Sequence, residues 1–448
     1  MSGISIAAQY VAARWRATRL QGDRLASWQQ RRAVATVDHV RARSVFHRQH
    51  WQGMPSAAWR EFPLVDKPMM MSDFEHFNTL GVTHDEAMQV ALAAESSRDV
   101  SAVVRGCTVG LSSGTSGHRG LFLVSPDEQT QWAGTILARA IPDLRLGHRV
   151  AFFLRANSRL YERTSSIVQF RFFDLMRPLD HVVASLNEFR PKLIVGPPSL
   201  LGMLADARDS GVLQVTPTRL ISVAEVLEPD DRSRLERTFQ VPVGEVYQCT
   251  EGLVAVSCHI GSLHVQEDVM VMQYEPVTAQ DPTRVSPILT DVWRRTQPII
   301  RYRLGDILRL DGTVCRCGSS WQRIASIEGR QDDICWFPDA TDSLRAVFPD
   351  AIRRMVLLAD ADIVEYRAEQ RAAGELVLQI EVREPSTFGG VVVRLQDTIR
   401  HSLAEYGCHA VAVTVEHGVP VRLPGAKRRR VVCAWRQATP APPPIMHA

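Results

Sequence analysis

Hydrophobic positions along the chain follow two different periods, and the alternation between them predicts strands interleaved with helices. Short apolar runs with the length of buried strands lie at 103–113, 148–156, 191–199 and 218–226. Between such runs, the stretches 128–141 and 232–240 show helical spacing. Alternation of this kind predicts an α/β domain built on a substantially parallel sheet.

The two ends of the chain show different patterns of hydrophobic and charged residues. The first 60 residues are arginine-rich and amphipathic, and Trp15, Trp28 and Trp51 are the expected packing anchors. Shorter strands between 255 and 312 indicate a β subdomain, and a small α+β pattern follows Gly329. The predicted divisions are a helical region packed on the large domain (1–60), the large domain (61–329), a small C-terminal domain (330–436) and a disordered Pro-rich tail (437–448).

Composition narrows the class of protein without identifying it. The chain has 448 residues, 45% of them hydrophobic, and a formal net charge of +3, so charge alone argues for neither a nucleic acid nor a membrane partner. Eight cysteines are too sparse for a disulfide scaffold, and the arginines near the start do not fit a signal peptide. We therefore expect a cytoplasmic protein. Of its 52 lysines and arginines, only Lys67, Lys192 and Lys427 are lysines.

A loop of glycines and hydroxyl residues, Leu111–Gly117, follows the first predicted strand. Its glycines permit a close approach of the backbone, and its hydroxyl and N–H groups can surround a phosphate. The loop lacks the Gly-Lys-Ser/Thr ending of a Walker A motif, and its composition is equally compatible with a polar turn. Three later segments decide between the readings: Tyr247–Glu251, Arg301–Asp306 and Gly329–Asp333.

In that order, these four segments resemble the core motifs of the adenylate-forming superfamily, and in detail those of phenylacetate-CoA ligases and coenzyme F390 synthetases. The resemblance covers about 60–435. It implies an α/β fold with a large N-terminal adenylation domain, containing parallel sheets and a β subdomain, and a small mobile α+β C-terminal domain. It further implies a ligase that uses ATP and Mg²⁺ to convert a carboxylic acid, favoured to be aromatic, into an acyl adenylate.

The resemblance also implies roles for individual residues. The loop residues that would surround the β and γ phosphates are Ser112, Ser113, Gly114, Thr115, Ser116 and Gly117. Thr250 would bind the α-phosphate, and Glu251 would hold Mg²⁺, a cation that prefers oxygen ligands. The remaining nucleotide contacts would come from Ala224 and Glu225, whose backbone lines the base, from Tyr247, which stacks on adenine, from Asp306 at the ribose, and from Arg330.

Lys427 is the expected catalytic residue of the C-terminal domain. In the resembled family, a lysine of the last motif bridges the carboxylate and the α-phosphate while the bond forms. The segment Gly425-Ala426-Lys427 departs from the family's Gly-Lys pattern by one residue, so this placement is an alignment choice. A basic surface run is the alternative. Asp332 is the expected hinge between half-reactions.

The acid and its acceptor are less specified. Candidate pocket residues at strand ends are Phe153, Asn157, Tyr161, Gly196 and Pro197. The acceptor would be CoA or a separate acyl carrier protein, because no phosphopantetheine-attachment segment is present. Transfer to an amine, F390-type adenylyl transfer, and a non-catalytic nucleotide-binding relative are the alternatives. We expect no nucleic acid or membrane partner, and a homodimer is left open.

Four residues have the composition of a structural zinc site. Cys315 and Cys317 form a Cys-x-Cys pair, and Cys258 and His264 lie upstream, with His259 as an alternative ligand. Three cysteines and a histidine are an established ligand set for structural Zn²⁺. Phenylacetate-CoA ligases show a similar arrangement, which favours zinc, while simple burial of the thiols is the competing interpretation.

Overall fold

The computed structural model describes residues 5–97, 102–111, 120–141, 148–154, 168–174, 177–279, 281–420 and 428–435. The chain folds into two compact units. The first consists mainly of the chain up to Leu304 together with Leu308–Ile327, and the second mainly of Gly305–Ile307 and the chain from Glu328. Residues 5–60 belong to the first unit, and the finer four-part division stays a prediction. None of the described helices is both long and apolar enough to cross a membrane.

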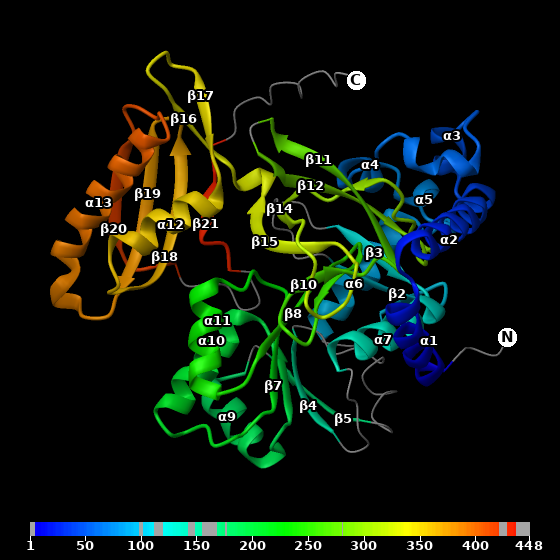
Figure 1. Ribbon diagram of the computed structural model, residues 1–448, viewed down its shortest axis with the longest axis horizontal. Coiled ribbons are helices and arrows are strands. Elements are labelled where there is room, and N and C mark those ends of the chain that lie inside the picture. Colours follow the sequence, from blue (N-terminus) through cyan, green and yellow to red (C-terminus); the bar gives the residue numbers. More distant parts are fainter. Residues whose placement is uncertain are drawn as a thin grey trace. The chain divides into compact units, whose positions relative to one another are not determined.

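A large mixed sheet organises the first unit (Figure 1). Its described strands run in the order β11 (Met270–Thr278), β12 (Asp281–Asp291), β14 (Asp306–Asp311), β15 (Arg323–Arg330), β10 (Leu263–Val265), β9 (Gly252–Ser257), β8 (Val243–Cys249), β7 (Arg219–Val223), β6 (Leu193–Gly196), β4 (Arg149–Leu154) and β5 (Gln169–Asp174), with β13 (Tyr302–Arg303) paired to β12. The neighbours from β5 to β8 are parallel. The mixed α/β fold expected from the sequence is confirmed.

Helices cover both faces of the parallel strands, which explains why β4 and β6 are apolar at nearly every position. One face packs against α9 (Leu179–Phe189), α10 (Pro198–Asp209) and α11 (Pro229–Phe239). The other face packs against α7 (Pro126–Ala140) and α1 (Ile6–Arg19), as Figure 1 shows. Helix α7 begins where the sequence dictates, because Ser125 and Glu128 form a capping box and Pro126 occupies the first turn.

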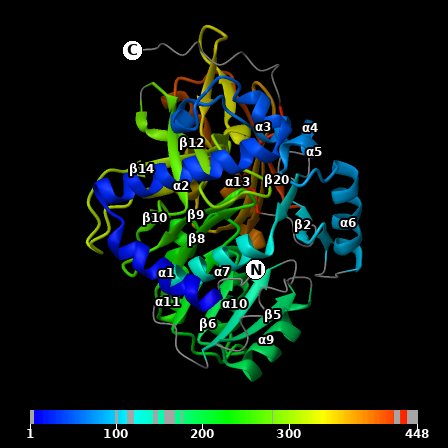
Figure 2. The ribbon, with the colours of Figure 1, turned by 90° about the vertical axis from the view of Figure 1, so that its right-hand side faces the viewer.

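Helices also form the N-terminal part of the first unit. They are α1, α2 (Gly22–Arg43), α3 (Val45–His50), the 3₁₀ helix Ser56–Glu61, α4 (Lys67–Ser72), α5 (Phe74–Phe77) and α6 (His84–Ser97), the last packing on the small sheet of β1 (Val103–Val104), β2 (Cys107–Leu111) and β3 (Leu121–Val124). Figure 2 shows α1 alongside α7. Trp51 is buried as expected, but Trp15 is 56% exposed, so its assignment as a packing anchor was wrong.

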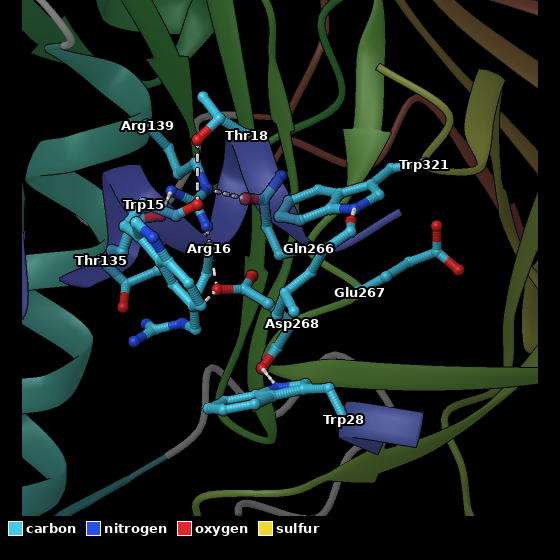
Figure 3. Close-up of polar contacts among 12 residues, drawn as sticks. Trp15, Arg16, Thr18, Trp28, Thr135, Arg139, Gln266, Glu267, Asp268 and Trp321 are labelled. Atoms are coloured by element: carbon cyan, nitrogen blue, oxygen red, sulfur yellow. Dashed lines mark hydrogen bonds and ion pairs between the residues drawn. The ribbon is translucent and has the colours of Figure 1, made fainter. Parts of the chain in front are cut away.

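A buried ion cluster holds α1 on the first unit (Figure 3). The fully buried Asp268 accepts hydrogen bonds from Arg16 Nε at 2.7 Å and from Arg139 Nη2 at 2.9 Å. Arg139 also donates to Ala13 O on α1 and to the Gln266 side chain. Arg139 can bind Asp268, Gln266 and Ala13 at once because its guanidinium presents several donors in a fixed plane.

Replacing Asp268 by asparagine should destabilise the first unit by about 3–5 kcal/mol, because it leaves the Arg16 and Arg139 charges buried without a counterion. Urea unfolding followed by tryptophan fluorescence measures the effect. Asp206→Asn is the matched control, since Asp206 pairs with Arg234 at the surface and its loss should cost less than about 1 kcal/mol. Equal losses in the two variants would contradict the role given to Asp268.

The second unit is a small α+β domain. Its described elements are the 3₁₀ helix Gln331–Asp333, β16 (Cys335–Pro338), β17 (Leu344–Val347), α12 (Pro349–Ala359), β18 (Ile363–Ala372), β19 (Glu375–Val382), α13 (Phe388–Glu405), β20 (Ala412–His417) and β21 (Val431–Cys433). The sheet order is β20-β19-β18-β21, and α12 and α13 contribute to its hydrophobic core.

Candidate functional site

Three of the predicted site segments lie at the carboxyl ends of adjacent strands of the large sheet. Strands β6, β7 and β8 are adjacent and parallel, so their carboxyl ends lie side by side. Gly196-Pro197 ends β6, Ala224-Glu225 follows β7 and Thr250-Glu251 follows β8. In open α/β sheets, ligands bind outside the carboxyl ends of the strands. The structure therefore brings these segments together where that rule places a ligand.

The turn after β7 has a strained backbone. Ala224 has a φ of +69°, which is uncommon for a residue with a Cβ, and Glu225 N donates to Val223 O at 2.9 Å. The Glu225 carboxylate accepts a hydrogen bond from Ser199 N at the start of α10. The Glu225 side chain thus binds the N-terminus of α10, while the backbone of the turn lies at the carboxyl end of β7.

Glu251 is almost fully buried, and two hydroxyl groups orient its carboxylate. Tyr302 Oη donates to Glu251 Oε1 at 3.0 Å, and Thr250 Oγ1 donates to Oε2 at 2.9 Å. Burial, followed by the negative charge of Glu251, raises the pKa of Tyr302 well above its usual value, so the phenol remains a donor. Tyr302 was not among the predicted site residues, although it lies inside the Arg301–Asp306 segment that was.

Two other predicted residues of this region lie in hydrophobic clusters. Tyr247 is 8% exposed and packs with Val254 and Val265, so its stacking on adenine stays a prediction. Phe153 is fully buried and stacks on Phe173 with ring centroids 5.0 Å apart. This placement gives Phe153 a core contact.

Gly196 lies close to the Phe153 side chain. A Cβ built on Gly196 would lie 3.2 Å from Phe153 Cβ and 3.3 Å from Leu200 Cδ2. A side chain at this position would therefore pack tightly against Phe153 and Leu200, whatever the role of Gly196 in a substrate pocket.

Further predicted residues belong to the second unit or lie outside the described residues. In the second unit, the half-buried Asp306 lies 3.9 Å from Arg330 Nε, and the exposed Asp332 belongs to the 3₁₀ helix Gln331–Asp333. The predicted residues that lie outside the described residues are Ser112, Ser113, Gly114, Thr115, Ser116, Gly117, Asn157, Tyr161 and Lys427. Their roles stay predictions.

The four predicted zinc ligands come together in the first unit. Their ligand atoms all lie within 4.8 Å of one another. Cys258 Sγ is 3.9 Å from Cys315 Sγ, and Cys317 Sγ is 3.5 Å from His264 Nε2. Zinc bonds of about 2.3 Å to sulfur and about 2.0 Å to nitrogen at tetrahedral angles require separations of about 3.8 and 3.5 Å. The donor set and its spacing fit a tetrahedral metal ion.

The surroundings of this cluster also suit a metal. His264 Nδ1 lies 3.0 Å from Trp321 O, and a hydrogen bond there leaves Nε2 available as a ligand. Burial opposes ionisation of the Cys315 and Cys317 thiols, but hydrogen bonds lower the pKa of Cys315 to about 6. Burial and the contacts with Cys315 and Cys258 raise the pKa of Cys317 to about 11, so Cys315 is the thiol that ionises first. A thiolate is the form that binds zinc.

Comparisons with known proteins find distant relatives in sequence and solved structures of similar fold. No family model matches the chain. Phenylacetate-coenzyme A ligase of Thermus thermophilus is 25% identical over 222 residues, which are 45% of this chain and 48% of that protein. Protein CapK of Staphylococcus aureus is 21% identical over 222 residues, 49% of this chain and 48% of that protein. The chain spans about half the length of the curated relatives it matches.

Solved structures match over almost the whole chain. A 2-hydroxyisobutyryl-CoA ligase in the postadenylation state has a TM-score of 0.68 at 17% identity, covering 93% of this chain and 91% of that one. AtGH3.15 acyl acid amido synthetase has a TM-score of 0.59 at 12% identity, covering 93% and 90%. At these identities the likeness concerns the fold.

Proposed function

The chain has the fold of the adenylate-forming ligases, and from this premise we propose that it activates a carboxylic acid with ATP and passes the acyl group to a thiol. In the first step a carboxylate oxygen bonds to the α-phosphorus of ATP, the bond to the β-phosphate breaks, and pyrophosphate leaves. In the second step the thiol loses its proton to solvent, its sulfur bonds to the acyl carbon, and the bond between that carbon and the phosphate oxygen breaks so that AMP leaves. The relative that is named a phenylacetate-coenzyme A ligase supports an aromatic acid and CoA as the partners.

The observation that carries this proposal is the meeting of Gly196, Ala224 and Thr250-Glu251 at the carboxyl ends of adjacent strands. Glu251 offers an oriented carboxylate, the ligand type that Mg²⁺ prefers. When bound, Mg²⁺ would offset the negative charge that accumulates on the phosphates. The chain itself holds Glu251 through Tyr302, and Thr250 stands next to it to contact the α-phosphate.

The test is acid-dependent exchange of radioactive pyrophosphate into ATP, with a panel of aromatic and aliphatic acids. Exchange with at least one acid is expected. Well-folded protein that binds ATP and yet gives no exchange with any acid would contradict acyl adenylate formation.

The acceptor is resolved by adding CoA, an acyl carrier protein or amines together with the productive acid. We expect a CoA thioester in the mass spectrum. An amide as the sole product would instead favour the alternative in which an amine is the acceptor, and an adenylylated product with no acyl transfer would favour the F390-type reaction.

We further propose that Cys258, His264, Cys315 and Cys317 bind a structural Zn²⁺, on the strength of the separations between their ligand atoms. The purified protein should contain one equivalent of zinc, measured by mass spectrometry of the metal. Cys315→Ser should lose most of it and melt at a lower temperature, because a structural zinc site stabilises the folded state. Cys408→Ser, which removes a buried thiol outside the cluster, should keep the metal. If removal of zinc from the wild-type protein leaves its melting temperature unchanged, the proposal is contradicted.

A further inference from the structure

The segment Asp291–Gln297, which the proposed function does not use, contacts both Thr250 of the proposed site and strand β3. Thr250-Glu251 follow β8. Strand β3 begins at Leu121 and pairs with β2, and in the sequence the glycine-hydroxyl segment lies between these two strands. The segment itself follows β12 and carries Arg294, an arginine that is only 7% exposed.

Arg294 contacts both Thr250 and β3 directly. Its Nη1 donates to Thr250 O, and its Nη2 donates to Leu123 O at 3.1 Å. The two acceptors are backbone carbonyls, so the contact fixes the position of the chain rather than of a mobile side chain. A guanidinium suits this bridge because its donors are held in a rigid plane, whereas an ammonium is a point donor.

Gln297 holds the same strand beside Arg294. Its Oε1 accepts from Leu123 N at 2.7 Å, and its Nε2 donates to Leu121 O at 3.1 Å. Among the described strands β3 is the edge of its sheet, and its outward backbone groups would otherwise lack a strand partner. The side chains of Gln297 and Arg294 take the place of that strand.

The segment is itself rigidly held. Asp291 Oδ1 accepts from Trp293 N and Arg294 N, and Glu128 Oε1 accepts from Arg295 N and Thr296 N. Glu128 also caps the first turn of α7, which follows β3 directly. The turn is therefore anchored to the large sheet and to α7 through buried carboxylates.

Gly252 lies where the segment Asp291–Gln297 packs against the residues that follow β8. Gly252 follows Glu251, and a Cβ built on it would lie 3.0 Å from Asp291 Oδ2 and 2.7 Å from Met270 Cε. Its φ of +155° also lies in the range that favours glycine. Backbone and side-chain contacts thus agree in setting Thr250-Glu251 against Asp291–Gln297.

We propose that Arg294 is a positioning residue that fixes Thr250-Glu251 relative to strand β3 and so keeps Thr250-Glu251 in place to bind ATP with Mg²⁺. This inference rests on the proposed function, since it assigns Thr250-Glu251 to the nucleotide. Arg294 acts through the carbonyls of Thr250 and Leu123.

The test compares Arg294→Lys with Arg309→Lys, a matched control whose arginine pairs with Asp281 away from this segment. Calorimetry measures binding of α,β-methylene-ATP with Mg²⁺, which needs no knowledge of the acid. Arg294→Lys should bind the analogue at least about tenfold more weakly, because displacement of a positioned group by about 1 Å has effects of that size or larger. Arg309→Lys should bind it as the wild type does.

Kinetic measurements distinguish a selective effect on ATP binding from a general loss of folded structure. With the acid found by pyrophosphate exchange, Arg294→Lys should raise KM for ATP, leave KM for the acid unchanged and melt near the wild-type temperature. If the lysine variant fails to fold, Gln297→Met, which removes the hydrogen bonds to β3 and the contact with Met70 Sδ and leaves Arg294 in place, should show the same selective loss for ATP. Wild-type affinity for the analogue in a folded variant would overturn this inference alone. Failure of the wild type to bind the analogue would overturn the proposed function as well.

Discussion

Glu251→Gln is expected to lower the rate of acid-dependent pyrophosphate exchange by about 10²- to 10³-fold, the effect typical of removing one electrostatic contact to a transition state. The substitution keeps the shape of the side chain and removes its charge. The amide has one acceptor oxygen, so only one of Tyr302 Oη and Thr250 Oγ1 can still donate to it, and the other hydroxyl faces the amide NH2 group. The loss should be partly reversed by raising the Mg²⁺ concentration if Glu251 holds the cation.

The control for this variant lies on β8, the strand that precedes Glu251. Glu245, near the start of β8, pairs with Arg232 at 2.9 Å, at the end of the strand opposite Glu251. Glu245→Gln should change stability more than exchange. Tyr302→Phe keeps the charge of Glu251 and removes one hydrogen bond, so its effect on exchange should be smaller, about tenfold. Normal exchange by Glu251→Gln would remove Glu251 from the site.

Parts of the fold could be predicted because their cause is local. The apolar runs at 148–156, 191–199 and 218–226 form β4, β6 and β7, and helices bury both faces of these strands. Strand β5 escaped prediction because Arg171 interrupts its apolar pattern, although the strand pairs in parallel with β4 throughout. Trp15 was misassigned since a helical pattern does not reveal which of several apolar residues faces the protein.

The site shows the same division. Thr250, Glu251 and Ala224 were predicted from the resemblance, and each lies directly after a strand. Arg294 and Asp268 were not, because their partners lie far along the chain and include backbone groups that carry no sequence signal. Arg16 and Asp268, for example, are 252 positions apart. The resemblance predicts residues that contact substrate, and the structure shows further residues that hold some of them in place.

The second unit bears on the choice of catalytic cation. Three arginines follow Lys427 in the sequence, and each is engaged with a carboxylate of the same unit. Arg428 and Arg430 both pair with Glu365, at 2.7 and 3.1 Å, and Arg429 pairs with the buried Asp333. The basic run is therefore largely committed to holding β21 on its domain. This reduces the case for a nucleic acid-binding surface.

Lys427→Arg should accordingly lower adenylation by about 10²- to 10³-fold, although the charge is kept. A lysine ammonium is a compact charge on a flexible stem, whereas a guanidinium is broad and planar and cannot take the same position between a carboxylate and a phosphate. Lys192→Arg, at an exposed position before β6, is the matched control and should leave exchange unchanged. Because Arg428, Arg429 and Arg430 already have partners, none of them is expected to replace the lost ammonium. Near-normal exchange by Lys427→Arg would mean that the catalytic lysine of the resembled motif has no counterpart at this position.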